Sequence, residues 1–368
     1  MRPTFFGAVP LSTAALSTPA ARTRAPADRA IAWWLVACAG MVFAMAVIGA
    51  ITRLTESGLS IVEWKPVAGT LPPLSEQAWL AEFDKYKATP EYLIRNAGMS
   101  LDEFKQIFFW EWFHRLWGRL IGVVFLVPFL WFWLTGRVRR ELLPTLWGLF
   151  VLGGLQGALG WYMVMSGLVD RPDVSHYRLA AHLSLAILIY ACLLGVAFRL
   201  LDPAPAAVPA AASLRRHARA ALALVAVTIV WGAFVAGLDA GLAYNSWPLM
   251  NGVFAPEEMW NLASAWMNLV ENTAAVQFTH RWLAILTALV VLGLAWRMAR
   301  AGMARAGALL ALAVVAQVSL GIATLLLFVP IHVAATHQAG ALVVVGLLVW
   351  CLARFRARLR GQPAPAAA

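Results

Sequence analysis

The stretch Glu111-Trp-Phe-His-Arg115 lies near the start of one long apolar run, 109–135, and the similar stretch Gln277-Phe-Thr-His-Arg281 lies near the start of another, 273–296. A helix needs about 20 apolar residues to cross the roughly 30 Å of hydrocarbon in a bilayer. Both runs meet this length, so each predicts a membrane-spanning helix with a histidine near one end. The similarity of the two stretches also indicates an internal repeat.

Six further apolar runs reach the same length, and the composition agrees with a membrane protein. Of the 368 residues, 61% are hydrophobic and only 13% are charged, whereas soluble domains carry about 25% charged residues. We therefore predict an all-α integral membrane protein with eight transmembrane helices. The predicted spans are about 31–51, 109–135, 142–164, 176–199, 217–238, 273–296, 305–327 and 331–353.

Basic residues occur in short clusters between the apolar runs, although the net charge of +11 is high. This pattern is typical of membrane topology signals and argues against nucleic acid as a partner. The arginine clusters precede the first span and follow the second, fourth, sixth and eighth. By the positive-inside rule, we expect both termini to be cytoplasmic. The short loops, rich in Ala and Arg, favour a multi-pass protein of the bacterial inner (plasma) membrane.

Four segments outside the spans complete the predicted organisation. The long outer loop is also expected to form amphipathic helix around Leu74–Tyr86 and Leu101–Phe109. The segments are a disordered cytoplasmic tail at 1–30, the outer loop at 52–108, a cytoplasmic linker at 200–216 and a basic cytoplasmic tail at 354–368.

The two halves of the chain repeat each other. We predict two tandem, pseudo-symmetric four-helix bundles, 31–199 and 217–353, which share one orientation because each has an even number of spans. At one constant offset along the chain, Gly49-Ala50, Glu56, Gly58, Leu59, Trp64 and Gly69 match Gly232-Ala233, Asp239, Gly241, Leu242, Trp247 and Gly252; further on, at a shorter offset, Gln156 and Gly160 match Gln317 and Gly321.

Four of the seven histidines occupy equivalent places in this repeat. His114 and His280 lie in the second span of each unit, and His182 and His337 lie in the fourth. Each is expected roughly 10 Å inside the outer end of its span, since a helix rises 1.5 Å per residue. A single histidine at this depth is usually a packed core residue, whereas two pairs at one level indicate a functional site.

Two imidazoles that face each other across a helical bundle can be the axial ligands of a haem iron. Zinc would need four ligands close together, and no other carboxylate or thiol is placed to complete such a site. Non-haem iron would need an acid beside two histidines. Glu111 could supply that acid in the first half, but Gln277 replaces it in the second. The pattern therefore favours two haem sites with two histidines each.

Glu111 and the arginines that follow the histidines each have two interpretations. Glu111 lies one turn before His114 and could steer a proton or a water during an oxidation, or could only orient the imidazole. Arg115 and Arg281 could pair with haem propionates or could reach out to water and headgroups. Because Gln277 is uncharged, we expect the first half to be reactive and the second to hold a redox cofactor.

The other histidines are weaker candidates. His176 precedes His182 by six residues and His332 precedes His337 by five, so neither shares a helix face with its neighbour. His217 follows two arginines and is expected to be solvated. The three cysteines lie in apolar segments without a CxxC spacing, which argues against a disulfide or a zinc site.

Together these motifs resemble the haem A synthase family. The resemblance covers residues 31 to 353, and the long outer loop without cysteines is similar to the proteobacterial and mitochondrial branch. It rests on the segments Thr52–Pro66, Phe109–Arg115, Tyr177–His182, Gln277–Arg281 and His337-Gln338.

The resemblance implies a reaction and its site. The family oxidises the C8 methyl group of haem O to a formyl group and so makes haem A for cytochrome c oxidase, which would make this chain a haem O oxidoreductase with water as the oxygen source. His280 and His337 would ligate the iron of a resident haem b, and His114 and His182 would face the iron of the substrate haem O. Glu111 matches the catalytic carboxylate of the family. The implied partners are haem O synthase in a transient complex, the cytochrome c oxidase assembly process, membrane lipid and an unidentified electron acceptor.

The residues alone leave two alternatives open. A di-haem b-type electron-transfer cytochrome would use the same two histidine pairs, and so would a carrier that binds haem without chemistry. The difference between Glu111 and Gln277 separates the oxidising enzyme from the cytochrome, because only methyl oxidation requires the carboxylate. Recovery of unchanged haem O after incubation with an electron acceptor would favour the carrier.

Overall fold

The computed structural model describes residues 19–64, 68–167, 174–202 and 210–356. Eight helices in these segments are long and apolar enough to cross a membrane, which confirms the prediction of an all-α membrane protein. They are α1 (Pro19–Leu54), α4 (Leu101–Leu134), α5 (Leu143–Gly167), α6 (His176–Leu201), α7 (Ala211–Gly237), α9 (Thr273–Arg300), α10 (Ala304–Leu326) and α11 (Ile331–Arg354).

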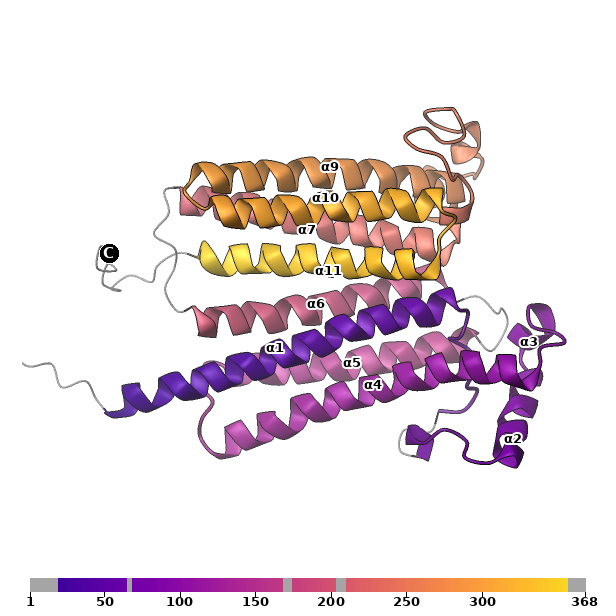
Figure 1. The fold of residues 1–368 in the computed structure, drawn as a ribbon, viewed down its shortest axis with the longest axis horizontal. Helices are drawn as coiled ribbons and strands as arrows, with labels where there is room; N and C mark the ends of the chain where they lie inside the picture. Colours follow the sequence, from indigo (N-terminus) through magenta and orange to yellow (C-terminus); the bar gives the residue numbers. More distant parts are fainter. Residues whose placement is uncertain (1–18, 65–67, 168–173, 203–209, 357–368) are drawn as a thin grey trace, which may run out of the picture.

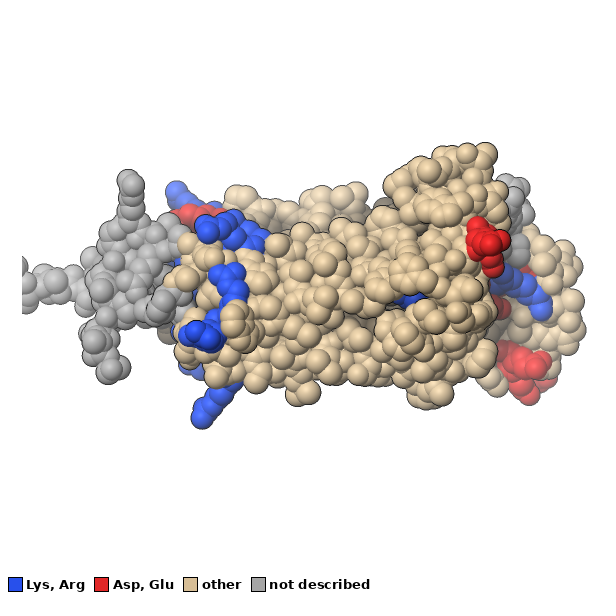
Figure 2. Space-filling view, turned by 90° about the horizontal axis from the view of Figure 1, so that it is seen from above, with Lys and Arg blue, Asp and Glu red and all other residues tan. Residues whose placement is uncertain are grey.

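The surface of these helices is apolar along most of their length. Leu120, Val123 and Val127 of α4 are exposed, and so are Leu286 and Leu289 of α9. Figure 2 shows a broad middle band almost free of charged side chains, with Lys and Arg gathered at one end and Asp and Glu mainly at the other. A continuous apolar surface of this kind is unfavourable in water and suits the interior of a bilayer.

The helices pack in two closed rings of four. In the first ring α1 contacts α4 and α6, and α5 contacts the same two helices; in the second, α7 contacts α9 and α11, and α10 contacts the same two (Figure 1). The rings meet through α1 on α11, α6 on α7, and α6 on α11. Under the sequence repeat, the contact of α1 with α11 corresponds to that of α7 with α6. The joining contacts therefore obey the same internal symmetry as the sequence.

The main apolar core fills only one half of this assembly. Its fully buried members include Ile31 and Leu35 of α1, Phe129 of α4, Leu193 of α6 and Leu294 of α9. On every helix that carries one of the four paired histidines, the buried core residues lie on the same side of that histidine, toward the end that holds the start of α1 and the end of α11. The main core therefore ends at the level of the histidines.

The N-terminal boundary differs from the expectation of a disordered tail over 1–30. α1 begins at Pro19, so residues 19–30 are helical, while residues 1–18 lie outside the described part. Alanine, abundant in this stretch, has the highest helix propensity. The carboxylate of Asp28, which is buried, also accepts hydrogen bonds from Arg139 in the turn after α4. Both features extend the helix toward the N-terminus.

The linker is shorter at both ends than expected, and the C-terminal tail begins one residue later, because α11 ends at Arg354. Helix α6 continues to Leu201 and α7 starts at Ala211, so the linker 200–216 is helical at both ends. Residues 203–209 of the linker lie outside the described part, and so do residues 357–368 of the basic tail.

The long outer loop forms a small helical cap, as predicted. It contains η1 (Ala68–Thr70), α2 (Glu76–Lys87) and α3 (Pro90–Ile94), and the expected helix at Leu101–Phe109 is continuous with the membrane span in α4. A capping box between Ser100 and Glu103 fixes the start of α4. The cap packs on α4 through a cluster of aromatic side chains, Phe83, Tyr86, Phe104 and Phe108. In the second half, η2 (Ala240–Leu242), η3 (Glu257–Trp260) and α8 (Ala265–Glu271) occupy the corresponding loop.

Candidate functional site

Each of the four paired histidines packs against a glycine on a neighbouring helix. A Cβ on Gly49 or Gly160 would lie 3.3 or 3.1 Å from an imidazole atom of His114 or His182. In the second half, a Cβ on Gly232 or Gly321 would lie 3.0 or 2.8 Å from His280 or His337. Real Cβ atoms rarely approach so closely, so the missing side chains leave room for the four rings.

The glycines follow the repeat as strictly as the histidines do. Gly49 of α1 corresponds to Gly232 of α7, and Gly160 of α5 corresponds to Gly321 of α10. The structure also brings the histidines together in the predicted pairs: His114 and His182 are near enough to interact electrostatically, and so are His280 and His337.

These pairs are not part of a larger ligand set in the described residues. Nowhere in those segments do three His, Cys, Asp or Glu side chains gather closely enough to hold a metal ion. Each pair can therefore supply two protein ligands to a metal that brings its own equatorial donors, which is what a haem does.

A glutamine accompanies one histidine in each pair. The Gln317 amide lies 3.2 Å from Nδ1 of His337, and the Gln156 amide lies 3.2 Å from both ring nitrogens of His182. In both glutamines Oε1 is buried without a hydrogen-bond partner among the described residues. His280 places its Nδ1 3.2 Å from the carbonyl oxygen of Thr228. At His280 and His337 these contacts involve Nδ1, so they fix the orientation of the imidazole and leave Nε2 for a metal.

Glu111 is buried in a network that joins α4 to the outer loop. Its Oε1 accepts a hydrogen bond from Nη2 of Arg115 at 2.6 Å, and its Oε2 accepts bonds from Oγ of Ser60 and the backbone N–H of Ile61, both at 2.7 Å. Arg115 also donates to the carbonyl oxygens of Ile61 and Glu63, at 2.9 and 3.1 Å. The carboxylate is therefore paired with a charge and held by three donors.

The second half contains the same arrangement with a neutral amide. Arg281 donates to Oε1 of Gln277 at 2.9 Å and to the carbonyl oxygens of Tyr244 and Ser246, at 2.7 and 2.8 Å. Under the repeat, these two carbonyls correspond to the two that Arg115 binds. Gln277 additionally donates to the carbonyl oxygen of Ala240 at 2.6 Å. In each half, the arginine after the histidine thus fastens the outer loop to its helix.

Both arginines donate to protein carbonyls, and their role with haem propionates stays a prediction. One donor of Arg281, its Nε, is buried and lacks a hydrogen-bond partner among the described residues, as does Nε1 of Trp231. Two such donors in the second half fit an anionic group such as a carboxylate, because a buried donor without an acceptor is unfavourable.

The structure places the other histidines away from the pairs and corrects the interpretation of His217. Its Nε2 lies 2.9 Å from the carbonyl oxygen of Val290, and Arg297 lies 3.0 Å from its Nδ1, so His217 bridges α7 and α9 and is not simply solvated. His176 is buried at the contact of α6 with α7, where its ring packs on Phe234. His332 is exposed at the start of α11.

The charge of Glu111 affects the pKa of acidic groups in the outer cap. Glu91 of α3 is buried, and its burial, together with the negative charge of Glu111, raises the pKa of Glu91 to about 8. The pKa of Tyr86 is raised as well, by burial and by Glu91. The cap therefore holds a second acidic group that responds to the charge on Glu111.

Comparison with known proteins identifies the family. The family model described as cytochrome oxidase assembly protein matches residues 32–349. The chain belongs to this family. The resemblance drawn from the motifs is confirmed, and the matched range spans the positions of all four paired histidines.

Individual relatives carry a common name. Over 332 residues, which make up 89% of each protein, the chain is 68% identical to a haem A synthase of Rhodospirillum centenum. It is 52% identical to a haem A synthase of Parvibaculum lavamentivorans, over 87% of this chain and 93% of the relative. It is 50% identical to that of Nitrosospira multiformis, over 88% and 92%.

The repeated glycines and glutamines of this family member are visible in the sequence, but their spacing alone predicts no role for them. Their signal was present, since each recurs at the equivalent place in the other half: Gly49 matches Gly232, and Gln156 matches Gln317. What the sequence lacked was the helix register that places a glycine of one helix against a ring of another.

Proposed function

We propose that this chain is a haem A synthase, an oxidoreductase that converts the C8 methyl group of haem O to a formyl group with water as the oxygen source. The observation that carries the proposal is the unequal repeat in a member of the cytochrome oxidase assembly protein family. Both halves pair two histidines against two glycines, but only the first places a carboxylate, Glu111, one turn from a paired histidine. Its relatives with 50–68% identity are named haem A synthase.

In this proposal the second half is the mount for a resident haem b. His280 and His337 would hold its iron, and the Nε atom of Arg281 would face a propionate. When bound, haem b supplies one-electron transfer. The Gln317 amide supports the assignment: with its oxygen turned toward Nδ1 of His337, it would accept the ring N–H, and both Oε1 and the imidazole would be satisfied. Nε2 of His337 would then be the free ligand.

The first half would receive the substrate. His114 and His182 would flank the iron of haem O, and Gln156 would orient His182 as Gln317 orients His337. Glu111 would accept a proton as the methyl group is oxidised, and the neighbouring Arg115 would stabilise its charge between turnovers. The loop carbonyls bound by Arg115 would keep this carboxylate in place.

We further propose that the protein is a multi-pass protein of the bacterial inner membrane with cytoplasmic termini. The end of the structure with most of the basic side chains would face the cytoplasm (Figure 2). Haem O would arrive from haem O synthase through a transient complex, and haem A would pass on to cytochrome c oxidase assembly.

Mass analysis of haems extracted after co-expression with a haem O synthase tests the function. We expect haem b together with haem A, and haem b with unreacted haem O in the Glu111→Gln variant. Two equivalents of haem b, unchanged when haem O is supplied, would instead identify a di-haem electron-transfer cytochrome. Recovery of unaltered haem O in the presence of an electron acceptor would identify a carrier.

A further inference from the structure

A chain of hydroxyl groups leads from Glu111 toward the outer surface. Oε2 of Glu111 accepts a hydrogen bond from Oγ of Ser60 at 2.7 Å, and the Ser60 hydroxyl also lies 3.1 Å from the carbonyl oxygen of Ser57. The hydroxyls of Ser57 and Thr55 are 2.6 Å apart. Ser57 and Ser60 are buried, so these groups form a polar path through the protein interior.

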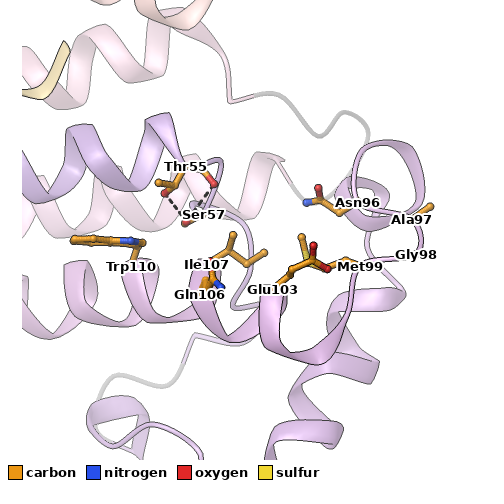
Figure 3. A pocket seen from close by; sticks show the side chains of 10 residues that line it. All are labelled: Thr55, Ser57, Asn96, Ala97, Gly98, Met99, Glu103, Gln106, Ile107 and Trp110. Atoms are coloured by element: carbon orange, nitrogen blue, oxygen red, sulfur yellow. Dashed lines mark hydrogen bonds between the residues drawn. The ribbon is translucent and has the colours of Figure 1, made fainter. Parts of the chain in front are cut away.

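This path ends in a cavity. Thr55 and Ser57 line a cavity of about 490 Å³ between the end of α1, the start of α4 and the segment after α3 (Figure 3). Its opposite wall includes Gly98 and Glu103, which are exposed. A polar cavity of this size that reaches the surface holds many water molecules. Glu111 is thus hydrogen-bonded to the Ser60 hydroxyl, and the next two hydroxyls, of Ser57 and Thr55, line a cavity that opens to the surface.

The second half contains a similar cavity but lacks hydroxyls at the three positions equivalent to Thr55, Ser57 and Ser60. A cavity of about 400 Å³ lies at the corresponding loop and is lined by Ala243, Tyr244 and Asn272, among others. Under the repeat, however, Thr55, Ser57 and Ser60 correspond to Leu238, Ala240 and Ala243. The hydroxyl chain is therefore present only in the half that also has a carboxylate, and a structural role common to both loops does not require it.

We propose that Ser60, Ser57 and Thr55 form a proton route between Glu111 and the outer cavity. The proposal rests on the proposed function. Oxidation of the methyl group by water follows R–CH3 + H2O → R–CHO + 4 H⁺ + 4 e⁻, in which two C–H bonds break and a C=O bond forms. The electrons leave through an external one-electron carrier, and the protons must reach water. In this route Glu111 passes them to the Ser60 hydroxyl, which bonds to the carbonyl oxygen of Ser57, so transfer from Ser60 to the Ser57 hydroxyl requires a water between them.

Three substitutions interrupt the route at known positions. Ser60→Ala and Ser57→Ala introduce the side chains that the second half tolerates at Ala243 and Ala240. Thr55→Val removes a hydroxyl that also bonds to the carbonyl oxygen four residues earlier, at 2.8 Å. Thr324→Val in α10 is the matched control, because the Thr324 hydroxyl makes the same bond, at 2.7 Å, and lies outside the route.

The first measurement needs no turnover. After a rapid drop in pH, time-resolved infrared spectroscopy of the purified protein follows protonation of the Glu111 carboxylate, whose band is identified by its loss in Glu111→Gln. We expect protonation to be at least about tenfold slower in Ser60→Ala than in the wild type, and unchanged in Thr324→Val. Arg115, Glu91 and Tyr86 also face Glu111, and none of them is altered in these variants. Equal protonation rates in all variants would overturn the proposal.

The second measurement is single-turnover oxidation of haem O in H2O and D2O. Loss of the route should slow oxidation and raise the solvent isotope effect, because proton release becomes rate-limiting, while the absorbance of the resident haem stays unchanged. Slower oxidation with an unchanged isotope effect would show that Ser60 only orients Glu111, and the route would be disproved. If the wild type itself left haem O unoxidised, the proposed function would fail instead, so the two failures are distinguishable.

Discussion

Gly321 of α10 and His337 of α11 are in such close contact that a Cβ on the glycine would lie 2.8 Å from Cε1 of the imidazole. This is the tightest of the four contacts between glycines and paired histidines. A ring held this closely has little freedom to turn, and its orientation determines where Nε2 points. The glycine is therefore as much a part of the candidate site as the histidine that it faces.

Replacing this glycine should displace the ring. We expect Gly321→Ala to force a shift of His337 at a cost of about 1–3 kcal/mol, the usual range for overpacking. The absorbance of the resident haem in the purified protein should fall or change its ligand-sensitive bands. Gly157→Ala in α5 is the control, since a Cβ there meets nothing within 4 Å. A normal haem spectrum in Gly321→Ala would show that the close contact is unimportant for ligation.

Removing one histidine should have different effects in the two pairs on haem absorbance and on conversion of haem O. His280→Ala and His337→Ala are expected to abolish the absorbance of the resident haem, because one axial ligand is lost. His114→Ala and His182→Ala should keep that absorbance and lose conversion of haem O. Optical spectra of the four purified variants, together with extracted haem analysis, provide the measurement. An unaltered bis-histidine spectrum in both second-half variants would contradict the assignment of ligands.

Arg115 and Arg281 occupy equivalent places in the two halves, but Arg115 binds a charged carboxylate and Arg281 a neutral amide. Arg115→Ala leaves the buried carboxylate of Glu111 without its counter-charge, and loss of one partner of a buried ion pair costs about 3–5 kcal/mol. Arg281→Ala leaves only the neutral amide of Gln277 and loop carbonyls unpaired, for which about 1–3 kcal/mol is typical. Thermal unfolding in detergent should therefore show a larger loss for Arg115→Ala.

The double variant Glu111→Gln with Arg115→Ala checks this reason. Without the charge on Glu111, the cost of removing Arg115 should fall toward that of Arg281→Ala. If the double variant is no more stable than Arg115→Ala alone, the loss comes from the loop carbonyls of Ile61 and Glu63 and not from the uncompensated charge.

Much of this architecture could be predicted from the sequence, because a membrane imposes a simple rule. Eight apolar runs gave eight helices, and the histidine pairs followed from the internal repeat. The boundaries were less accessible: the cap continues into α4 without a break, and α1 starts before the apolar segment. Helical propensity and an ion pair of the buried Asp28 with the exposed Arg139 favour that start, and neither contributes to hydropathy.

The contacts between side chains were beyond the reach of sequence patterns. Arg115 and Arg281 both bind backbone carbonyls of their own outer loops, contacts that the motifs did not predict. Predicting this requires the path of an irregular loop. The contact of Ser60 with Glu111 could not be predicted for the same reason. Ser60 lies 51 residues before Glu111, and the two meet only because the loop returns to α4.

The buried acid of the cap, Glu91, should make the stability of the outer loop depend on pH. The pKa of Glu91 is raised from 4.5 to about 8 in the folded protein, by burial first and then by the charge of Glu111. Between these values the folded state binds more protons than the unfolded state, so stability decreases as the pH rises. The full contribution is present below about pH 4.5 and is lost through about pH 8, by at most about 1.4 kcal/mol per pH unit.

Limited proteolysis of the outer loop between about pH 5 and pH 9 measures this effect. Resistance of the wild-type loop should fall across that range, relative to a Glu91→Gln variant measured at the same pH, because glutamine does not ionise. Glu103→Gln provides the control, since hydrogen bonds from the backbone and side chain of Ser100 lower the pKa of Glu103, so that this carboxylate stays ionised throughout the range and its loss should leave the pH dependence unchanged. Glu111→Gln should also reduce the pH dependence, because it removes the second cause of the shift at Glu91. A parallel pH response in the wild type and in Glu91→Gln would show that another group controls the cap.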